Sequence, residues 1–353
     1  MKPLVESPYR IHSKIKAFAS SHQIYALVPG LILTALIAGF ALLLYLTSNL
    51  HLLNPLLIAV ILGIAVRNTV GISATYQPGI AFSMKRILRL AVILLGLKLS
   101  LGQVMAVGLP GLGIVTLSSV STFWLTCWLG KKLRVNPRLT QLIAAGTSIC
   151  GASAVVATNA VVESSEEDMA YAISLITGLG TLAMLSYPLM SELLQLSPGA
   201  FGLWCGASIH EVAQVVAAGF QQSTTSGEIA TITKLSRVLL IIPIVAVLSC
   251  QKKSQHRSSS RAGGSGSLPI PWFVLLFGAV VLCNSTGIIP AWAKSSLLVI
   301  NQFFLCVSMA AMGLMTRLTS LAQIGIKPFY LAGLSWAFLS VLSLTLVEFI
   351  ARL

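Results

Sequence analysis

The sequence predicts an all-α protein that crosses a membrane many times. Of its 353 residues, 56% are apolar and only 9% are charged, whereas a soluble domain carries about 25% charged residues. Apolar runs near 20 residues recur along the whole chain, long enough to cross a bilayer. The runs are continuously apolar, which excludes the alternating strands of a membrane barrel and leaves helices as the spanning structure.

Eleven apolar segments predict about ten to eleven transmembrane helices. They cover residues 27–47, 54–66, 87–104, 111–129, 139–162, 169–190, 200–219, 229–249, 270–288, 298–316 and 327–350. Between two of them lies QKKSQHRSSSRAGGSGSL, whose composition is typical of a flexible linker. The predicted organisation is a basic cytoplasmic tail (1–24), a first membrane helix group with both interrupted helices (25–250), a cytoplasmic linker (251–268) and a second helix group (269–353).

The distribution of charge predicts the orientation of the chain, because short cytoplasmic loops are enriched in lysine and arginine. With a cytoplasmic N-terminus, 18 of the 23 lysines and arginines fall on the cytoplasmic side. Lys294 and Arg352 fall outside, together with the acidic loop 163–168. This asymmetry accounts for the net charge of +14 without any nucleic-acid partner.

Two internal similarities predict repeats and discontinuous helices. At an offset of 217, segment 94–108 matches segment 310–325, so that Gly96 meets Gly313 and Gly108 meets Gly325. The two helices run in opposite directions in the predicted topology, and inverted repeats are typical of secondary transporters. At an offset of 55, the Cys-Gly-Ala-Ser sequence of 150–153 recurs at 205–208, and both copies interrupt an apolar run. Whether 200–219 spans or re-enters the membrane stays open.

The first interrupted run, GTSICGASAVVATNAVV (146–162), is rich in small and polar residues. Close helix packing through small residues is one interpretation. The functional interpretation is a broken helix, whose second half begins near 148–153 with unpaired N–H groups and a positive dipole end that binds anions. Its candidate substrate-binding residues are Ser148, Cys150, Gly151, Ser153 and Asn159.

The second interrupted run, GLWCGASIHEVAQVVAAG (202–219), adds ionisable side chains to the candidate site. Its candidate substrate-binding residues are Gly206, Ser208, His210 and Gln214. An ionisable residue inside a span is costly and indicates function by default, although a satisfied structural pair is the alternative. His210 and Glu211 are predicted to couple transport to an ion, because histidine and buried glutamate can both change charge near neutral pH.

Three cations inside predicted spans, Lys98, Lys234 and Arg237, complete the predicted substrate site. The predicted spans hold one clear acidic residue, Glu211, against these three cations. The resulting excess of positive charge suits an anionic substrate. We expect Glu211 to pair with Lys234 or Arg237, and His210 to face the cavity beside Gln214, since residues four apart share a helical face. Snorkelling of the cations toward the surface is the alternative.

No other chemistry is readable in the chain. It has no P-loop, no G-x-S-x-G or H-E-x-x-H motif and no Ser-His-Asp spacing. The six cysteines lack C-x-x-C spacing, so no metal or redox site is expected. We therefore predict no enzyme activity, no cofactor and no metal.

Five segments carry a resemblance to a known family: SICGASAVVAT (148–158), IHEVAQVVAAG (209–219), KLSRV (234–238), IPWF (270–273) and MAAMGL (309–314). In this order they resemble the YeiH family of bacterial inner-membrane proteins, which is named for sulfate export. That family is grouped with transporters similar to sodium/bile-acid symporters and cation/proton antiporters, which have inverted repeats and discontinuous helices. Family members tend to carry an acid where this chain has Asn159; if that acid serves ion coupling, coupling here would shift to Glu163 or Glu211.

The resulting hypothesis is a secondary transporter in the bacterial inner membrane that exports a small anion such as sulfate or an organosulfonate. Its expected partners are the anion, a coupling proton or sodium ion and the lipid bilayer; a homodimer stays open. The alternative is an uncoupled anion channel or a receptor-like membrane module. Inverted similarity and two interrupted helices favour the transporter.

Overall fold

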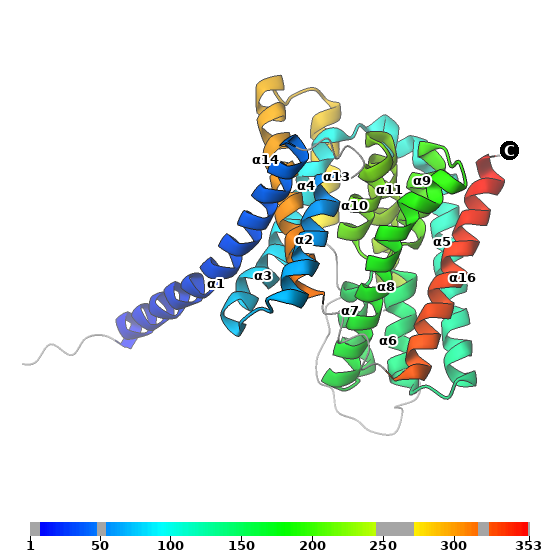
Figure 1. The fold of residues 1–353 in the computed structure, drawn as a ribbon, viewed down its shortest axis with the longest axis horizontal. Helices are drawn as coiled ribbons and strands as arrows, with labels where there is room; N and C mark the ends of the chain where they lie inside the picture. The colour runs from blue at the N-terminus through cyan, green and yellow to red at the C-terminus, as the bar shows by residue number, and fades with distance from the viewer. Residues whose placement is uncertain (1–7, 48–53, 245–271, 317–324, 352–353) are drawn as a thin grey trace, which may run out of the picture.

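A computed structural model describes residues 8–47, 54–244, 272–316 and 325–351, and these ranges contain helices and no strand (Figure 1). The helices are α1 (Pro8–Thr47), α2 (Pro55–Thr69), η1 (Ala74–Tyr76), α3 (Gln77–Phe82), the π-turn η2 (Ser83–Ile87), α4 (Leu88–Leu95), η3 (Gly96–Lys98), α5 (Leu101–Lys132), α6 (Pro137–Ser148), α7 (Ala152–Val162), α8 (Glu166–Leu193), α9 (Pro198–Ser208), α10 (Val212–Gln222), α11 (Thr224–Leu239), α13 (Trp272–Ser285), α14 (Ala291–Met315) and α16 (Ile326–Ala351).

Five of these helices are long and apolar enough to cross a membrane by themselves. Their apolar parts cover Tyr25–Thr47, Val107–Lys132, Glu166–Leu193, Ala291–Met315 and Ile326–Ile350. The predicted class, an all-α polytopic membrane protein, is confirmed. Residues 8–24 continue α1, while the predicted linker 251–268 lies outside the described residues.

The helices pack in two groups. The first contains α1–α4, α13 and α14, and the second contains α5–α11 and α16. In the first group α2 packs closely on α14, where a Cβ on Gly313 would lie 2.3 Å from the carbonyl oxygen of Val60. The predicted division at 251–268 does not separate these groups, because α16 packs on α5 and α9 and α14 packs on α1 and α2.

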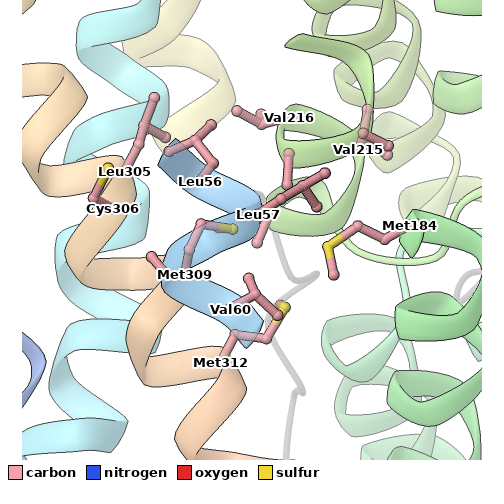
Figure 2. Packing of buried hydrophobic residues seen from close by; sticks show 14 of the residues in the cluster. Leu56, Leu57, Val60, Met184, Val215, Val216, Leu305, Cys306, Met309 and Met312 are labelled. Carbon is pink, nitrogen blue, oxygen red and sulfur yellow. The ribbon is translucent and has the colours of Figure 1, made fainter. Parts of the chain in front are cut away.

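Helix α2 also faces the second group through a layer of aliphatic and sulfur-containing side chains (Figure 2). Leu56, Leu57 and Val60 of α2 lie between α14 and the side chains of Met184 on α8 and Val216 on α10. Inside a bilayer such side chains stabilise the contact by close packing, because lipid is as apolar as they are. The short helix α2 is therefore part of the interface between the two groups.

The predicted inverted similarity joins segment 94–108, which covers the end of α4, η3 and the start of α5, to segment 310–325, whose described part is the end of α14 and the residue before α16. Gly108 kinks α5 with φ 41° and ψ −153°, a conformation that a side chain strongly disfavours. Gly325 directly precedes α16. The inverted repeat itself stays a prediction.

Two of the predicted apolar segments are helical hairpins: 139–162, which was expected to be a broken span, and 200–219, for which spanning and re-entry were both left open. Helices α6 and α7 form one hairpin, in which Arg138 at the start of α6 donates from Nη1 to the carbonyl oxygen of Glu163, just after α7, at 3.0 Å. Helices α9 and α10 form the other, in which Gln222 at the end of α10 donates to the carbonyl oxygen of Leu196, just before α9, at 3.2 Å. Each hairpin therefore begins and ends at the same end of the bundle.

The two hairpins open at opposite ends of the bundle. Helix α8, of 28 residues and about 42 Å, connects the base of the first hairpin to the base of the second (Figure 1). The acidic loop 163–168 thus lies beside Arg138, and its predicted placement on the side opposite the basic residues is wrong. The reason is that a hairpin contains as many apolar residues as a membrane-spanning helix but returns to the side from which it started.

Local sequence explains why the hairpin helices begin where they do. Asn136 and Ser197 accept the backbone N–H groups of Arg138 and Ala200 at 2.9 and 3.2 Å. Each is followed by a proline in the first turn, where no N–H is needed. Arms of 11 or 12 residues extend about 16–18 Å, roughly half of a 30 Å hydrocarbon core. Tips of opposite hairpins therefore meet near the middle.

Candidate functional site

The tips of the two hairpins are in direct contact. The first tip is Ile149–Gly151 and the second is Ile209–Glu211. Gly151 has φ 74° and ψ −135°, and a Cβ added there would lie 2.7 Å from Cγ of Glu211. The glycine therefore provides both the turn of the first tip and the space for the carboxylate arm of the second.

Lys234 on α11 joins the two tips. Its ammonium group is 0% exposed and donates to the carbonyl oxygens of Ile149 at 3.0 Å and Ile209 at 2.8 Å. These carbonyls follow the C-terminal turns of α6 and α9. A cation is favoured there by the negative end of each helix dipole.

Arg237, one turn further along α11, is also 0% exposed and has the same role. Its guanidinium donates to the carbonyl oxygens of Ser148 at 2.8 Å, Ala207 at 2.8 Å, Ile209 at 3.2 Å and Thr147. The alternative that Lys234 and Arg237 snorkel to the surface is wrong. Both cations instead satisfy carbonyl groups that the broken helices leave unpaired.

The hydrogen-bond partners of Glu211 differ from those expected. Its Oε1 accepts a hydrogen bond from Oγ1 of Thr177 on α8 at 2.8 Å, and its carboxylate also faces the backbone N–H of Ala152, the first residue of α7. In the described residues no hydrogen bond joins Glu211 to Lys234 or Arg237, but Lys234 is its charged neighbour, as expected. The positive end of α7 also stabilises the carboxylate.

Gln214 fixes the second hairpin to α8. Its Oε1 accepts the N–H of Glu211 at 3.1 Å, and its Nε2 donates to the carbonyl of Thr177 at 3.1 Å and to Oγ1 of Thr181 at 3.3 Å. Gln214 is 0% exposed. These bonds use both ends of its amide, so Gln214 is a structural brace of the site.

His210 is the unexplained polar group at the tips. Its side chain is 0% exposed, and within the described residues neither ring nitrogen has a hydrogen-bond partner. Lys234 and Arg237 are its charged neighbours. His210 lies before the first residue of α10, so the helical spacing that predicted a shared face with Gln214 does not apply.

The remaining small residues of the two copied motifs have unequal positions. Cys150 and Ser153 contact each other at the first tip, with Sγ and Oγ 2.9 Å apart, and Ser153 is exposed. Gly206 lies within α9, where a Cβ would be 2.5 Å from Cβ of Thr233 on α11. Ser148 and Ser208 donate back to carbonyls of their own helices. Gly206 and Ser208 thus belong to helix packing.

Two predicted site residues lie away from the tips. Asn159 accepts from Ser164 N and Oγ at 3.0 and 2.6 Å and so closes the loop at the base of the first hairpin. The ammonium group of Lys98 lies 5.1 Å from the ring centre of Phe220. Phe220 follows Glu211 by nine residues, which is about 13 Å along a helix. The structure therefore does not bring Asn159 and Lys98 to the same place as His210 and Glu211.

Thr177 and Thr181 are site residues that the sequence analysis missed. They lie on α8 at a helical spacing of four and hold Glu211 and Gln214. A pair of threonines in an apolar helix is a weak signal, because threonine commonly bonds to its own helix, as Thr181 also does to the carbonyl of Thr177. Only the tertiary contact identifies their role.

The charges at the tips leave a positive surplus. Two helix N-termini and two helix C-termini meet there, so their dipoles roughly cancel. Among the described side chains, Lys234 and Arg237 oppose the one carboxylate of Glu211. In a low-dielectric interior such a surplus favours the binding of an anion.

Comparison with known proteins gives the family. Residues 29–332 match the family model described as conserved hypothetical protein 698. A UPF0324 membrane protein of Pseudomonas aeruginosa is 38% identical over 90% of this chain and 92% of its own. The UPF0324 inner membrane protein YeiH of Escherichia coli K12 is 35% identical over 89% and 91%.

A UPF0324 membrane protein of Corynebacterium glutamicum is 36% identical over 79% of this chain and 80% of its own. No solved structure matches. The family match covers both hairpins and α11, so the tips described above lie inside the shared region. The chain belongs to the UPF0324 family of membrane proteins, the family of YeiH.

Proposed function

We propose that the protein is a secondary transporter that exports a small anion, such as sulfate or an organosulfonate, and binds it at the hairpin tips. The observation that carries the proposal is the contact of two hairpins from opposite ends at a buried, net positive point. Discontinuous helices that meet near the midplane are the usual binding sites of secondary transporters. Among the described residues at the tips, no nucleophile is hydrogen-bonded to a base, in keeping with transport.

The tips also supply a group for ion coupling. His210 is buried without a partner beside two cations. Two neighbouring cations oppose protonation of His210 in the absence of the anion, so the imidazole would take up a proton together with the anion, whose charge offsets it, and a neutral imidazole would weaken anion binding. Glu211 is the second candidate for the coupling site, since its carboxylate is the acidic group at the tips.

Binding is tested by thermal unfolding of the purified full chain in detergent. Sulfate, isethionate, acetate and chloride are compared at one ionic strength. A ligand that binds only the folded protein at 100 times its Kd stabilises it by about 2.7 kcal/mol. We expect an oxyanion to raise Tm and the Gly151→Ala variant to lose that shift. Equal Tm values with all four salts would contradict an anion site.

Coupling is tested by flux of radiolabelled sulfate in proteoliposomes. We expect accumulation against the sulfate gradient when a pH or sodium gradient is imposed. Flux that only equilibrates sulfate under every gradient identifies an uncoupled channel instead. The two assays are independent, so failure of coupling leaves the binding result intact.

We further propose that the N-terminus is cytoplasmic. The end of α2, the end of α5 and the start of α16 lie at the same end of the bundle as the base of the first hairpin (Figure 1). Each carries a basic residue, Arg67, Lys131 and Lys327, and basic residues mark the cytoplasmic side. Reporters fused after residue 165 and after residue 262 are both expected to read cytoplasmic. An external reading at either position would contradict this orientation.

A further inference from the structure

A polar cavity lies at the far end of α10 from the tips. It has a volume of about 230 Å³, far more than the roughly 10–15 Å³ that one water requires. Its walls come from the end of α1, the start of α2, η3, the end of α10 and the middle of α14. Half of its twelve lining residues have polar side chains: Tyr45, Asn54, Lys98, Gln221, Asn301 and Gln302.

Lys98 supplies the positive charge that lines the cavity. Its ammonium group lies 5.1 Å from the ring centre of Phe220, which also lines the cavity. Its acidic neighbour is Glu228, whose carboxylate accepts a hydrogen bond from Nε2 of Gln103 at 2.8 Å. Lys98 is exposed and able to meet a ligand.

The part of the cavity wall that α14 provides holds a buried acceptor. Asn301 on α14 is 1% exposed, and within the described residues its Oδ1 has no hydrogen-bond partner. A buried polar atom left unpaired costs about 1–3 kcal/mol. A ligand with a hydroxyl or amino group in this cavity would satisfy it.

The cavity also has a fixed frame. The N–H of Asn54 donates to Oε1 of Gln221 at 2.7 Å, which links the start of α2 to the end of α10. Oδ1 of Asn54 accepts the N–H of Leu56 at 2.7 Å. The cavity is therefore formed between the two packing groups by contacts that do not use Lys98 or Asn301.

We propose that this cavity binds a small organic anion that carries a hydrogen-bond donor. Its anionic end pairs with Lys98, and its hydroxyl or amino group donates to Asn301. The site is separate from the hairpin tips, because Phe220 and Glu211 are nine residues apart on α10, about 13 Å. It does not require that the tips bind the same ligand.

The test uses isethionate, which has a sulfonate and a hydroxyl group, and ethanesulfonate, which lacks the hydroxyl. Binding to the purified full chain is measured by calorimetry for wild type, Lys98→Gln and Asn301→Leu. We expect Lys98→Gln to weaken isethionate about tenfold or more. Wild type is expected to bind isethionate more tightly than ethanesulfonate, and Asn301→Leu to bind the two equally.

Two controls separate this site from the tips and from misfolding. His210→Leu, at the tips, is expected to keep the preference for isethionate over ethanesulfonate. Tm is expected to stay near wild type in Lys98→Gln, because Lys98 is exposed, and in Asn301→Leu, because an unpaired acceptor is removed. A hydroxyl preference that survives in Asn301→Leu, or equal isethionate affinity in Lys98→Gln, would overturn the proposal.

Discussion

The two hairpins have nearly equal lengths and share a Cys-Gly-Ala-Ser sequence, yet they contribute different chemistry to their meeting point. In the first hairpin the motif forms the tip itself, with Cys150 and Gly151 in the turn. In the second it forms the last turn of α9, and the tip is Ile209–Glu211. The first tip supplies backbone and space, while the second supplies the ionisable side chains. The sequence match is therefore offset by about one helical turn from the structural match.

The two hairpins share the way in which the carbonyl groups at the end of their first helix are hydrogen-bonded. The C-terminal carbonyls of both α6 and α9 accept hydrogen bonds from Lys234 and Arg237 of α11. One short stretch of one helix thus stabilises both interruptions. The four predictions below test the shared part first and the unequal tips afterwards.

The largest effect is expected from Arg237→Leu. The carbonyl oxygens of Thr147, Ser148 and Ala207 would lose their side-chain donor in a buried site, while that of Ile209 would keep only Lys234. We expect the free energy of unfolding to fall by about 3–5 kcal/mol, measured by denaturant unfolding in detergent. The control is Arg138→Leu, since Arg138 is exposed and bonds to one carbonyl. Equal losses in both variants would contradict a shared cap.

The next effect distinguishes the two motif glycines from a neutral one. Gly151→Ala places a Cβ at φ 74° against Glu211, and we expect a loss of about 1–3 kcal/mol together with loss of anion binding. Gly206→Ala crowds Thr233 and should lower Tm while the remaining folded protein still binds the anion. Gly113→Ala, which meets no atom within 4 Å, is the control and should keep or raise Tm.

A binding loss in Gly206→Ala as complete as that in Gly151→Ala, in folded protein, would mean that the two motif copies have equal roles. The comparison of the hairpins would then be wrong. The measurement is the anion-dependent Tm shift of each glycine variant at one protein concentration.

A smaller effect is expected from Thr177→Val, which removes the donor to Glu211 and keeps the shape of the side chain. We expect a loss of about 1–2 kcal/mol, because α8 no longer holds the carboxylate of the second tip. Ser174→Ala is the control on the same helix, since Ser174 is exposed and bonds back to Ala170. The stability of both variants is measured by thermal unfolding. Equal losses of stability in Thr177→Val and Ser174→Ala would contradict a role of α8 in holding Glu211.

The sequence alone predicted the helical membrane class, the two interruptions and the grouping of His210, Glu211, Lys234 and Arg237 at one place. It could not predict the hairpins, because hydropathy measures the length of an apolar run and not whether its second half returns. It could not predict the hydrogen-bond partners of Lys234 and Arg237 either. The strongest buried acceptors for Lys234 and Arg237 are backbone carbonyls of helices 25 to 90 residues away in sequence, and every residue has such a carbonyl.

The same limit explains why two predicted site residues, Asn159 and Lys98, lie elsewhere in the structure. Asn159 follows the interruption closely in sequence, but a helix of 11 residues carries it to the base of its hairpin. Lys98 belongs to a predicted span, but η3 ends there, at the polar cavity. Spacing along a helix determines faces and distances only once the start of the helix is known.

The smallest effect on stability and the sharpest effect on function are expected at His210. Its ring is buried with both nitrogens unpaired in the described structure, so His210→Leu removes an unsatisfied group and should keep or raise Tm. Transport by wild type should rise as the pH falls on the side from which the anion binds, because a protonated imidazole adds charge opposite the anion. His210→Leu should flatten that pH profile in proteoliposomes. If the variant keeps the full pH dependence while remaining folded, the proton is carried elsewhere, and Glu211 at the same tip or a sodium ion becomes the coupling candidate.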